Sequence, residues 1–287
     1  MNPVALQLAN GNAFLFGLVM VIAALALCLW NAVRVFGFIS RITYIAGIVF
    51  VILSATPLPI WCYGLWLVLC IMSGAIVFSD RSSGLYSFRW KFFAAIAVSL
   101  FSMVIFFIEL PYHLSPTIQV AHNQTVYVIG DSVSAGISTK EHAWPDVLGD
   151  MTHLKVINLA KPGATVQMAI DQCEGITESN SLVFVEIGGN DLLGNTSGKT
   201  FYNQLDFLLG KLRGGNNQTA MFELPLLPFC NSFGYAQRTL ARKYNVILIP
   251  KHYLTDVFGL KDGTLDGLHL SQKGHDALAK SIYGLLK

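Results

Sequence analysis

The first 110 residues contain long uncharged apolar stretches. Residues 13–33 carry no charged side chain, and residues 42–79 carry none either. A helix needs about 20 apolar residues to cross a bilayer, so the first stretch fits one helix and the second fits two. Proline resists continuing a helix, so Pro57 and Pro59 mark the turn between those two. We therefore predict about four spans, near residues 13–34, 42–57, 60–79 and 92–110. The second is short, which leaves a re-entrant segment open.

Lysine and arginine next to membrane spans are retained on the cytoplasmic side. They occur in two of the expected loops, as Arg34 and Arg41 in one and as Arg81, Arg89 and Lys91 in the other. Four spans with both ends outside fit this distribution. The first span also lacks the basic leading segment of a cleavable signal peptide. We expect a multipass protein whose C-terminal half is extracytoplasmic.

From about residue 118 the pattern changes to short apolar runs that alternate with longer polar, helix-like stretches, as in a parallel sheet covered by helices. Short, largely apolar strands are typical of a sheet buried on both faces. The expected strands are residues 126–129, 156–159, 182–187, 220–224 and 246–249. The expected helices are residues 143–151, 166–175, 201–212, 235–244 and 271–286, the last with Ser271 as its N-cap. We therefore expect a membrane domain in residues 1–117 and an α/β domain in residues 118–287.

Composition agrees with a membrane segment and excludes some partners. The chain is 53% hydrophobic, but its net charge is only +2. No basic stripe with interleaved aromatic residues is present, so we expect no nucleic-acid partner. The histidines and cysteines show no ligand spacing, so we expect no metal and no other cofactor. Cys173 and Cys230 lie outside the expected spans, and whether they form a disulfide remains open.

Polar residues follow the expected strands. In an open parallel sheet, functional groups collect on the loops beyond the carboxyl ends of the strands. Four such loops carry candidate blocks, which are residues 130–132, 161–164, 188–191 and 266–269. All four should lie at one rim of the sheet.

The residue types in these blocks suit acyl transfer. A serine hydroxyl becomes a nucleophile when a histidine takes its proton, and a carboxylate orients that histidine. Ser132 is the candidate nucleophile, and Asp266 and His269 lie three residues apart on one loop. The transition state also needs donors for its oxyanion. The backbone amides of Ser132 and Gly163 and the side chain of Asn190 could supply them.

Simpler explanations exist for single members of this set. Ser132 alone could cap a helix, and Gly163 alone could serve a left-handed backbone conformation. Asp262 could compete with Asp266, which we prefer for its spacing to His269. The α/β-hydrolases share the chain order serine, aspartate, histidine, but their nucleophile motif is G-x-S-x-G, and residues 130–134 read GDSVS.

The four blocks resemble those of a known family. GDS at residues 130–132, the glycine of KPGAT, GND at residues 189–191 and D-x-x-H at residues 266–269 are similar, in order and spacing, to the marker blocks of the SGNH/GDSL hydrolases. The resemblance covers residues 122–287 and is strongest to small bacterial arylesterases, thioesterases and lysophospholipases. Val133 departs from the leucine of the family motif. The membrane segment is the larger departure, because those relatives are typically secreted and soluble.

The resemblance implies a flavodoxin-like three-layer sandwich with a five-stranded parallel sheet. It implies Ser132 as nucleophile, His269 as general base and then acid, and Asp266 as the orienting carboxylate. The oxyanion hole would be Ser132, Gly163 and Asn190. The implied reaction is hydrolysis of carboxylic esters or thioesters through an acyl-serine intermediate.

The two halves together lead us to expect a serine hydrolase anchored in the bacterial cytoplasmic membrane, with its catalytic domain on the periplasmic side. Lysophospholipids, other amphiphilic acyl esters and acylated envelope glycans are all suitable substrates. One alternative is an acyltransferase or deacetylase acting on envelope glycans, and another is a noncatalytic membrane assembly module. The acyl chain length, the oligomeric state and any protein partner remain open.

Overall fold

The protein divides into two units, each of which has its own hydrophobic core. The computed structural model describes residues 3–30, 34–79, 88–138 and 141–287. One unit, here called the helical unit, consists mainly of Gln7–Pro111. The other, here called the α/β unit, consists mainly of Tyr112–Leu226 and Cys230–Lys287.

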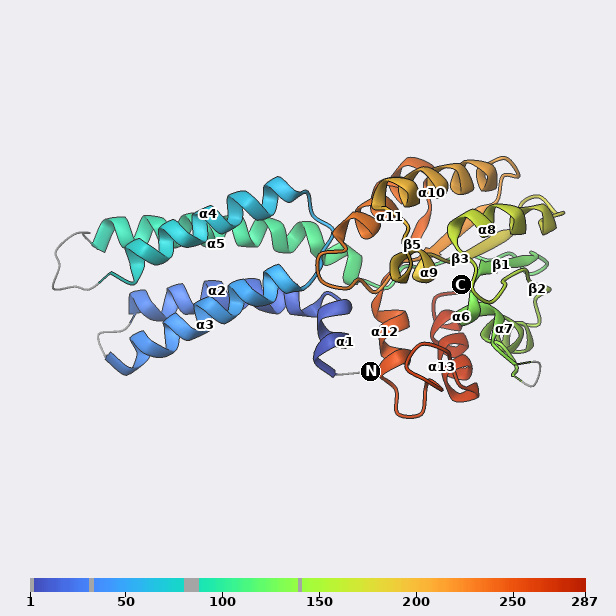
Figure 1. Ribbon diagram of the computed structural model, residues 1–287, viewed down its shortest axis with the longest axis horizontal. Coiled ribbons are helices and arrows are strands. Elements are labelled where there is room, and N and C mark those ends of the chain that lie inside the picture. The colour runs from blue at the N-terminus through green and yellow to red at the C-terminus, as the bar shows by residue number, and fades with distance from the viewer. Residues whose placement is uncertain (1–2, 31–33, 80–87, 139–140) are drawn as a thin grey trace. The chain divides into compact units, whose positions relative to one another are not determined.

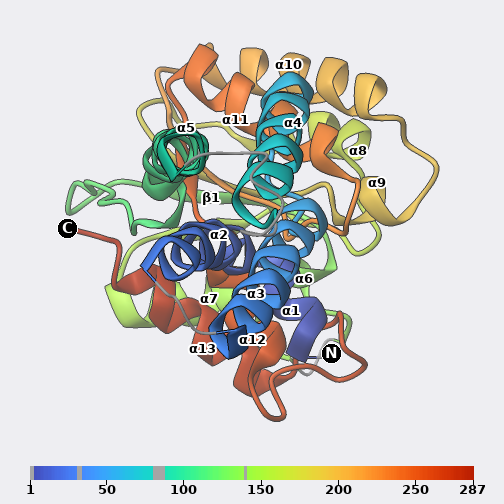
Figure 2. The ribbon, with the colours of Figure 1, turned by 90° about the vertical axis from the view of Figure 1, so that its left-hand side faces the viewer.

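The described residues of the helical unit form four long helices, which Figure 2 shows from one end. They are α2 (Asn12–Trp30), α3 (Arg34–Leu53), α4 (Ile60–Val77) and α5 (Phe88–Glu109), and a short helix α1 (Pro3–Ala9) precedes them. Among the described residues, α2, α4 and the segment Phe88–His113 are long and apolar enough to cross a membrane. The apolar part of α3, Gly37–Leu53, is shorter. Three helices therefore meet the requirement for a span, against the four that the sequence predicts.

The boundaries of the second predicted span need correction. The helix α3 begins at Arg34 rather than at residue 42. Arg34 was expected to end the first span, and residues 31–33, which precede it, lie outside the described part of the chain. The helix ends at Leu53 rather than at residue 57. The physical reason is that Pro57 and Pro59 provide no amide hydrogen, and a residue before proline is disfavoured in helical conformation.

Small residues and neutral hydrogen bonds hold the helical unit together. A Cβ atom on Gly17 would lie 2.7 Å from the carbonyl oxygen of Gly47, so α2 and α3 approach closely because both residues are glycine. The Tyr44 hydroxyl donates to the carbonyl of Cys70 at 2.8 Å, and the Trp66 indole donates to the Ser102 hydroxyl at 2.9 Å. Apolar side chains also point outward, including Trp30 and Ile60, which are 90% and 87% exposed.

The described residues of the α/β unit form a five-stranded parallel sheet with the order β2-β1-β3-β4-β5. This is the flavodoxin-like order, and it confirms the predicted fold. The strands are β1 (Val126–Gly130), β2 (Val156–Asn158), β3 (Leu182–Glu186), β4 (Gln218–Phe222) and β5 (Ile247–Ile249). The fourth strand begins and ends earlier than the expected residues 220–224, because Thr219 pairs with Val183 in the register with β3.

Helices cover both faces of the sheet (Figure 1). On one side lie α7 (Trp144–Thr152), α12 (His252–Gly259) and α13 (Gln272–Tyr283), whose apolar side chains share a core with Val128, Phe184 and Phe222. On the other side lie α8 (Val166–Gln172), α10 (Gly198–Arg213) and α11 (Asn231–Tyr244). Two short helices, α6 (Ser132–Ala135) and α9 (Gly189–Leu193), follow β1 and β3.

Several predicted helix ends change in the structure. The helix expected over residues 166–175 becomes a 3-10 turn after Gln172, and those expected to begin at residues 201 and 235 begin earlier, at Gly198 and Asn231. Ser197 caps the first of these by accepting from Thr200 N at 3.1 Å. The last helix ends at Tyr283, because residues beyond it pair with the segment at Ile118, whose amide donates to Leu285 O. Ser271 is the N-cap of α13, as predicted.

Candidate functional site

The turn from β1 into α6 presents the candidate nucleophile. Asp131 is the N-cap of α6, and its Oδ1 accepts from the backbone amide of Val133 at 2.9 Å. Ser132 is the first residue of that helix and is partly exposed. A side chain at Gly130 would meet the carbonyl oxygen of Glu186 at 2.8 Å, which requires glycine before the turn. The strand thus ends in a tight turn that places Ser132 at the carboxyl rim of the sheet.

Asn190 connects three of the predicted blocks. It lies in α9, directly after β3, and its Nδ2 donates to Ala164 O at 2.9 Å and to Asp131 Oδ2 at 3.2 Å. The neighbouring Asp191 is buried, and its Oδ2 accepts from the amide of Val166 at 2.9 Å. These bonds bring the serine block, the glycine block and the asparagine block together at one rim.

Gly163 lies in the exposed turn before α8 with a φ of 75°. This left-handed conformation favours glycine, so the conformational explanation of Gly163 holds. This conformation is compatible with an oxyanion-binding role for the Gly163 amide, because Asn190 Nδ2 donates to the carbonyl of the adjoining residue Ala164.

Asp266 and His269 form a hydrogen-bonded pair. Asp266 Oδ2 lies 2.6 Å from His269 Nδ1, and its Oδ1 accepts from the amides of His269 at 2.9 Å and Leu268 at 3.0 Å. These donors, the His269 amide foremost, lower the pKa of Asp266. A hydrogen on Nδ1 bound to a carboxylate leaves the other ring nitrogen free to accept a proton. The alternative carboxylate, Asp262, instead uses its backbone carbonyl to accept from Ser271 Oγ.

The histidine loop acts on the serine turn. Burial raises the pKa of Asp131 to about 6, and hydrogen bonds with the Val133 amide and Glu186, followed by an electrostatic contribution from His269, oppose this rise. That influence indicates that His269 lies within electrostatic range of the residue next to Ser132. The serine, glycine and asparagine blocks thus meet at one rim, and the loop of residues 266–269 carries a histidine paired with a carboxylate.

A buried polar network beneath the turn was missed by sequence reasoning. Ser134 Oγ donates to Glu186 Oε2 at 2.9 Å and accepts from Trp144 Nε1 at 3.1 Å. Ser134 is completely buried, so it does not compete with Ser132 as a nucleophile. His275 is also buried, and its Nδ1 accepts from the Trp144 amide at 3.2 Å, so it packs against α7. In the sequence, Glu186 could have indicated this network, because it is a charged residue at the end of an apolar strand.

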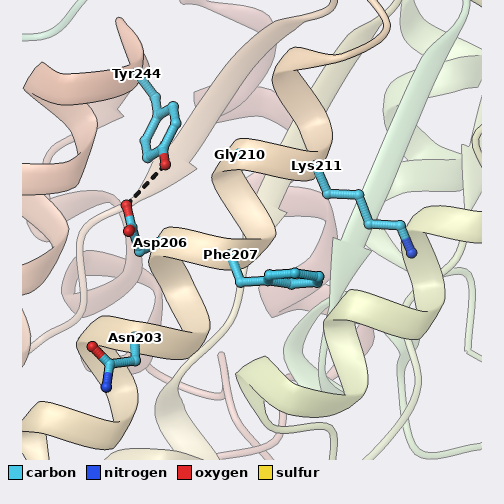
Figure 3. A pocket seen from close by; sticks show the side chains of 6 residues that line it. All are labelled: Asn203, Asp206, Phe207, Gly210, Lys211 and Tyr244. Atoms are coloured by element: carbon cyan, nitrogen blue, oxygen red, sulfur yellow. Dashed lines mark hydrogen bonds between the residues drawn. The ribbon is translucent and has the colours of Figure 1, made fainter.

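Other features of the described residues do not join this site. A surface pocket of 590 Å³ is lined by residues of α10, including Lys211, and by Tyr244 of α11, and none of the predicted site residues lines it (Figure 3). Cys173 and Cys230 are free thiols. Within the described ranges, no group of three or more histidine, cysteine, aspartate or glutamate residues is arranged to hold a metal ion.

The fold and the rim define a hydrolase of the three-layer α/β class. The model of the GDSL-like Lipase/Acylhydrolase family matches residues 128–277, and the chain belongs to this family. It is an SGNH-type acyl hydrolase, as the sequence blocks predicted.

Solved structures agree with the fold. The esterase EstA from Pseudoalteromonas sp., in a structure inhibited by monoethylphosphonate, is 23% identical with a TM-score of 0.51, and the match covers 56% of this chain and 96% of that one. The structure of TesA has the same identity and TM-score, with 56% and 97% covered. No curated protein matches the sequence. At these identities the likeness establishes the fold, and it extends over the α/β half of the chain only.

Proposed function

We propose that this protein is a membrane-anchored serine hydrolase that cleaves amphiphilic carboxylic esters or thioesters. Residues 1–117 form the membrane domain and residues 118–287 the hydrolase domain. The observation that carries the catalytic part is the 2.6 Å contact of His269 with Asp266, on a loop whose charge reaches the turn of Ser132.

In this proposal His269 Nε2 takes the hydroxyl proton as Ser132 Oγ attacks the acyl carbonyl carbon. The developing oxyanion is bound by the amides of Ser132 and Gly163 and by Asn190. The ester bond breaks as the histidine returns the proton to the leaving oxygen or sulfur. Water, deprotonated by His269, then attacks the acyl-serine, and the acyl–Oγ bond breaks as His269 gives that proton to Ser132 Oγ, which releases the acid and restores the serine.

Asn190 has to change partners in this mechanism. Its two amide hydrogens are directed at Ala164 O and Asp131 Oδ2. The bond to Asp131, at 3.2 Å, is the longer of the two, so it is the one that yields to an oxyanion. The Ala164 bond keeps the side chain in place during the exchange.

Exposed apolar side chains adjoin each block and support an amphiphilic substrate. Ile137 follows the serine turn, Met168 lies in α8, Leu193 ends α9, and Leu265 and Leu268 flank Asp266; each is between 43% and 57% exposed. Exposed apolar groups that recur around a polar site are suited to an acyl chain. An acetyl group would leave most of this surface unused.

Hydrolysis of p-nitrophenyl esters from acetate to decanoate by the detergent-solubilised full chain tests the proposal. We expect Ser132→Ala to lower kcat/KM by about 10⁴-fold or more, and Ser179→Ala, on an exposed loop, to leave it unchanged. Each methylene that enters an apolar site contributes at most about 0.8 kcal/mol, so kcat/KM should rise with chain length. Full activity in Ser132→Ala would refute the nucleophile, and a preference for acetate would refute the amphiphilic substrate.

We infer an inner-membrane protein with an extracytoplasmic hydrolase domain from the apolar lengths of α2, α4 and α5, with α3 as a fourth and shorter span, and from the positions of the basic residues. Cys230, a partly exposed free thiol of the α/β unit, is a native probe of this topology. A membrane-impermeant maleimide should label it in spheroplasts and not in sealed inside-out vesicles, with Cys230→Ser as the control. The reverse labelling would place the hydrolase domain in the cytoplasm.

A further inference from the structure

Two buried carboxyl groups lie directly beneath the nucleophile turn. Glu186 is the last residue of β3 and pairs in register with Gly130, the last residue of β1. Glu186 and Asp131 are each 3% exposed, and their carboxyl groups lie within hydrogen-bonding reach of each other. Two carboxylates in such a place would repel each other strongly, so one of them holds a proton.

The directions of the hydrogen bonds indicate which of the two carboxyl groups is ionised. Asp131 Oδ1 accepts from the Val133 amide, and its Oδ2 accepts from Asn190 Nδ2. Both of these nitrogens can only donate. Each oxygen of Asp131 is therefore an acceptor, which suits a carboxylate.

The hydrogen bonds of Glu186 likewise indicate which of its oxygens can carry the proton. The Trp144 indole nitrogen can only donate, so Ser134 Oγ accepts from it and directs its own hydrogen to Glu186 Oε2. Glu186 Oε2 is thus an acceptor as well. Glu186 also bonds the backbone amide of Asp131, and its second oxygen, Oε1, can carry a hydrogen towards the Asp131 carboxylate.

We propose that Glu186 is a positioning residue, which as a neutral carboxylic acid donates its O–H to Asp131 and so holds the turn of Ser132 and, before a substrate binds, the amide of Asn190 in place. Asp131 caps the helix that begins with Ser132 and also accepts from Asn190, so a shift of its carboxylate would move both groups. The inference rests on the proposed roles of Ser132 and Asn190.

The charges around the pair agree with this assignment. Burial and the neighbouring Asp131 raise the pKa of Glu186 well above its usual range. Burial and the charge of Asp191 raise the pKa of Asp131, and His269 lowers it, with about 6 as the result. These directions favour a proton on Glu186 rather than on Asp131. At higher pH, ionisation of Glu186 would break the shared hydrogen bond.

Two substitutions separate positioning from simple packing. Glutamine has the donor and the acceptor of a neutral glutamic acid, so Glu186→Gln should keep kcat within about threefold at pH 7 and lose the alkaline decline of the wild type. Glu186→Leu removes both groups, and because a displacement of about 1 Å can cost about 100-fold, kcat should fall at least about tenfold with little change in KM. Glu174→Gln, at an exposed glutamate, is the matched control.

Infrared spectroscopy of the full chain at pH 7 supplies a readout that does not depend on activity. The wild-type spectrum minus the Glu186→Gln spectrum should contain the carbonyl band of a protonated carboxylic acid, because the contributions of all other carboxyl groups cancel. The proposal is overturned if that band is missing from the difference spectrum, or if Glu186→Gln loses as much kcat as Glu186→Leu. Labelling of Ser132 by a fluorophosphonate, measured on the same samples, distinguishes such a result from a failure of the proposed nucleophile.

Discussion

The helical unit and the α/β unit bury different kinds of polar side chain. In the helices these are mostly neutral groups such as Tyr44, Ser73 and Ser102, which bond across helices; Glu109, at the last residue of α5, is the exception. In the α/β unit, buried carboxyl groups follow or end the strands, as with Asp131 and Glu186. Burying a charge is costly unless it is paired or hydrogen-bonded. Buried charge therefore marks the rim where chemistry is expected, whereas buried hydroxyls in the helices fix packing.

Exposed apolar side chains show the opposite distribution to that of the buried carboxyl groups. Long stretches of the helical unit expose large apolar side chains, such as Phe16 at 60% and Ile71 at 63%. Such a continuous surface needs lipid or a partner to cover it. In the α/β unit the strands place their apolar side chains in the core, and the exposed ones include those next to the catalytic blocks. The comparison supports the proposal that one unit anchors the protein and the other carries the chemistry.

The largest effect is expected where a buried ion pair holds the α/β unit together. Arg238 Nε lies 2.6 Å from Glu223 Oε1, and the two side chains are 4% and 0% exposed. Removing one partner of such a pair costs about 3–5 kcal/mol. Thermal unfolding of Glu223→Ala, followed by tryptophan fluorescence, should show this loss. Lys243→Ala, which breaks a half-exposed pair with Asp206, should cost under about 1 kcal/mol. Equal losses in the two variants would contradict the role given to burial.

A somewhat smaller effect, on catalysis, is expected when the side-chain amide of Asn190 is removed. Loss of one oxyanion donor costs about 2.7–4 kcal/mol, or about 10²–10³ in kcat. Asn190→Ala should show a decrease of this size in ester hydrolysis with KM nearly unchanged. Asn203→Ala, on the exposed face of α10, is a suitable control. A decrease confined to KM would mean that Asn190 binds substrate rather than the oxyanion.

The smallest effect is expected in the helical unit. Tyr44→Phe removes the hydroxyl that bonds Cys70 O and Ser73 Oγ. Hydrogen bonds between membrane helices contribute about 0.6 kcal/mol on average, so the unfolding temperature in detergent should change little and kcat should not change. A large loss of activity in this variant would show that the helices do more than anchor the enzyme.

The sequence predicted what depends on local pattern. Strands of buried apolar residues and the four short blocks were found because their signals lie within a few neighbouring residues. The helix α12, His252–Gly259, was missed because it is short and directly follows Pro250 and Lys251. The link between Ser134 and Glu186 was also missed, since 52 residues separate them and only the register of β1 with β3 brings them together. Pairings of that kind require the fold first.

The most direct test of the central claim is mass spectrometry of the full-length protein after reaction with a fluorophosphonate. The account predicts a single phosphonyl adduct on Ser132, formed in parallel with loss of ester hydrolysis and absent from Ser132→Ala. An adduct on another residue, or complete inactivation with Ser132 unmodified, would contradict the assignment of Ser132 as the nucleophile.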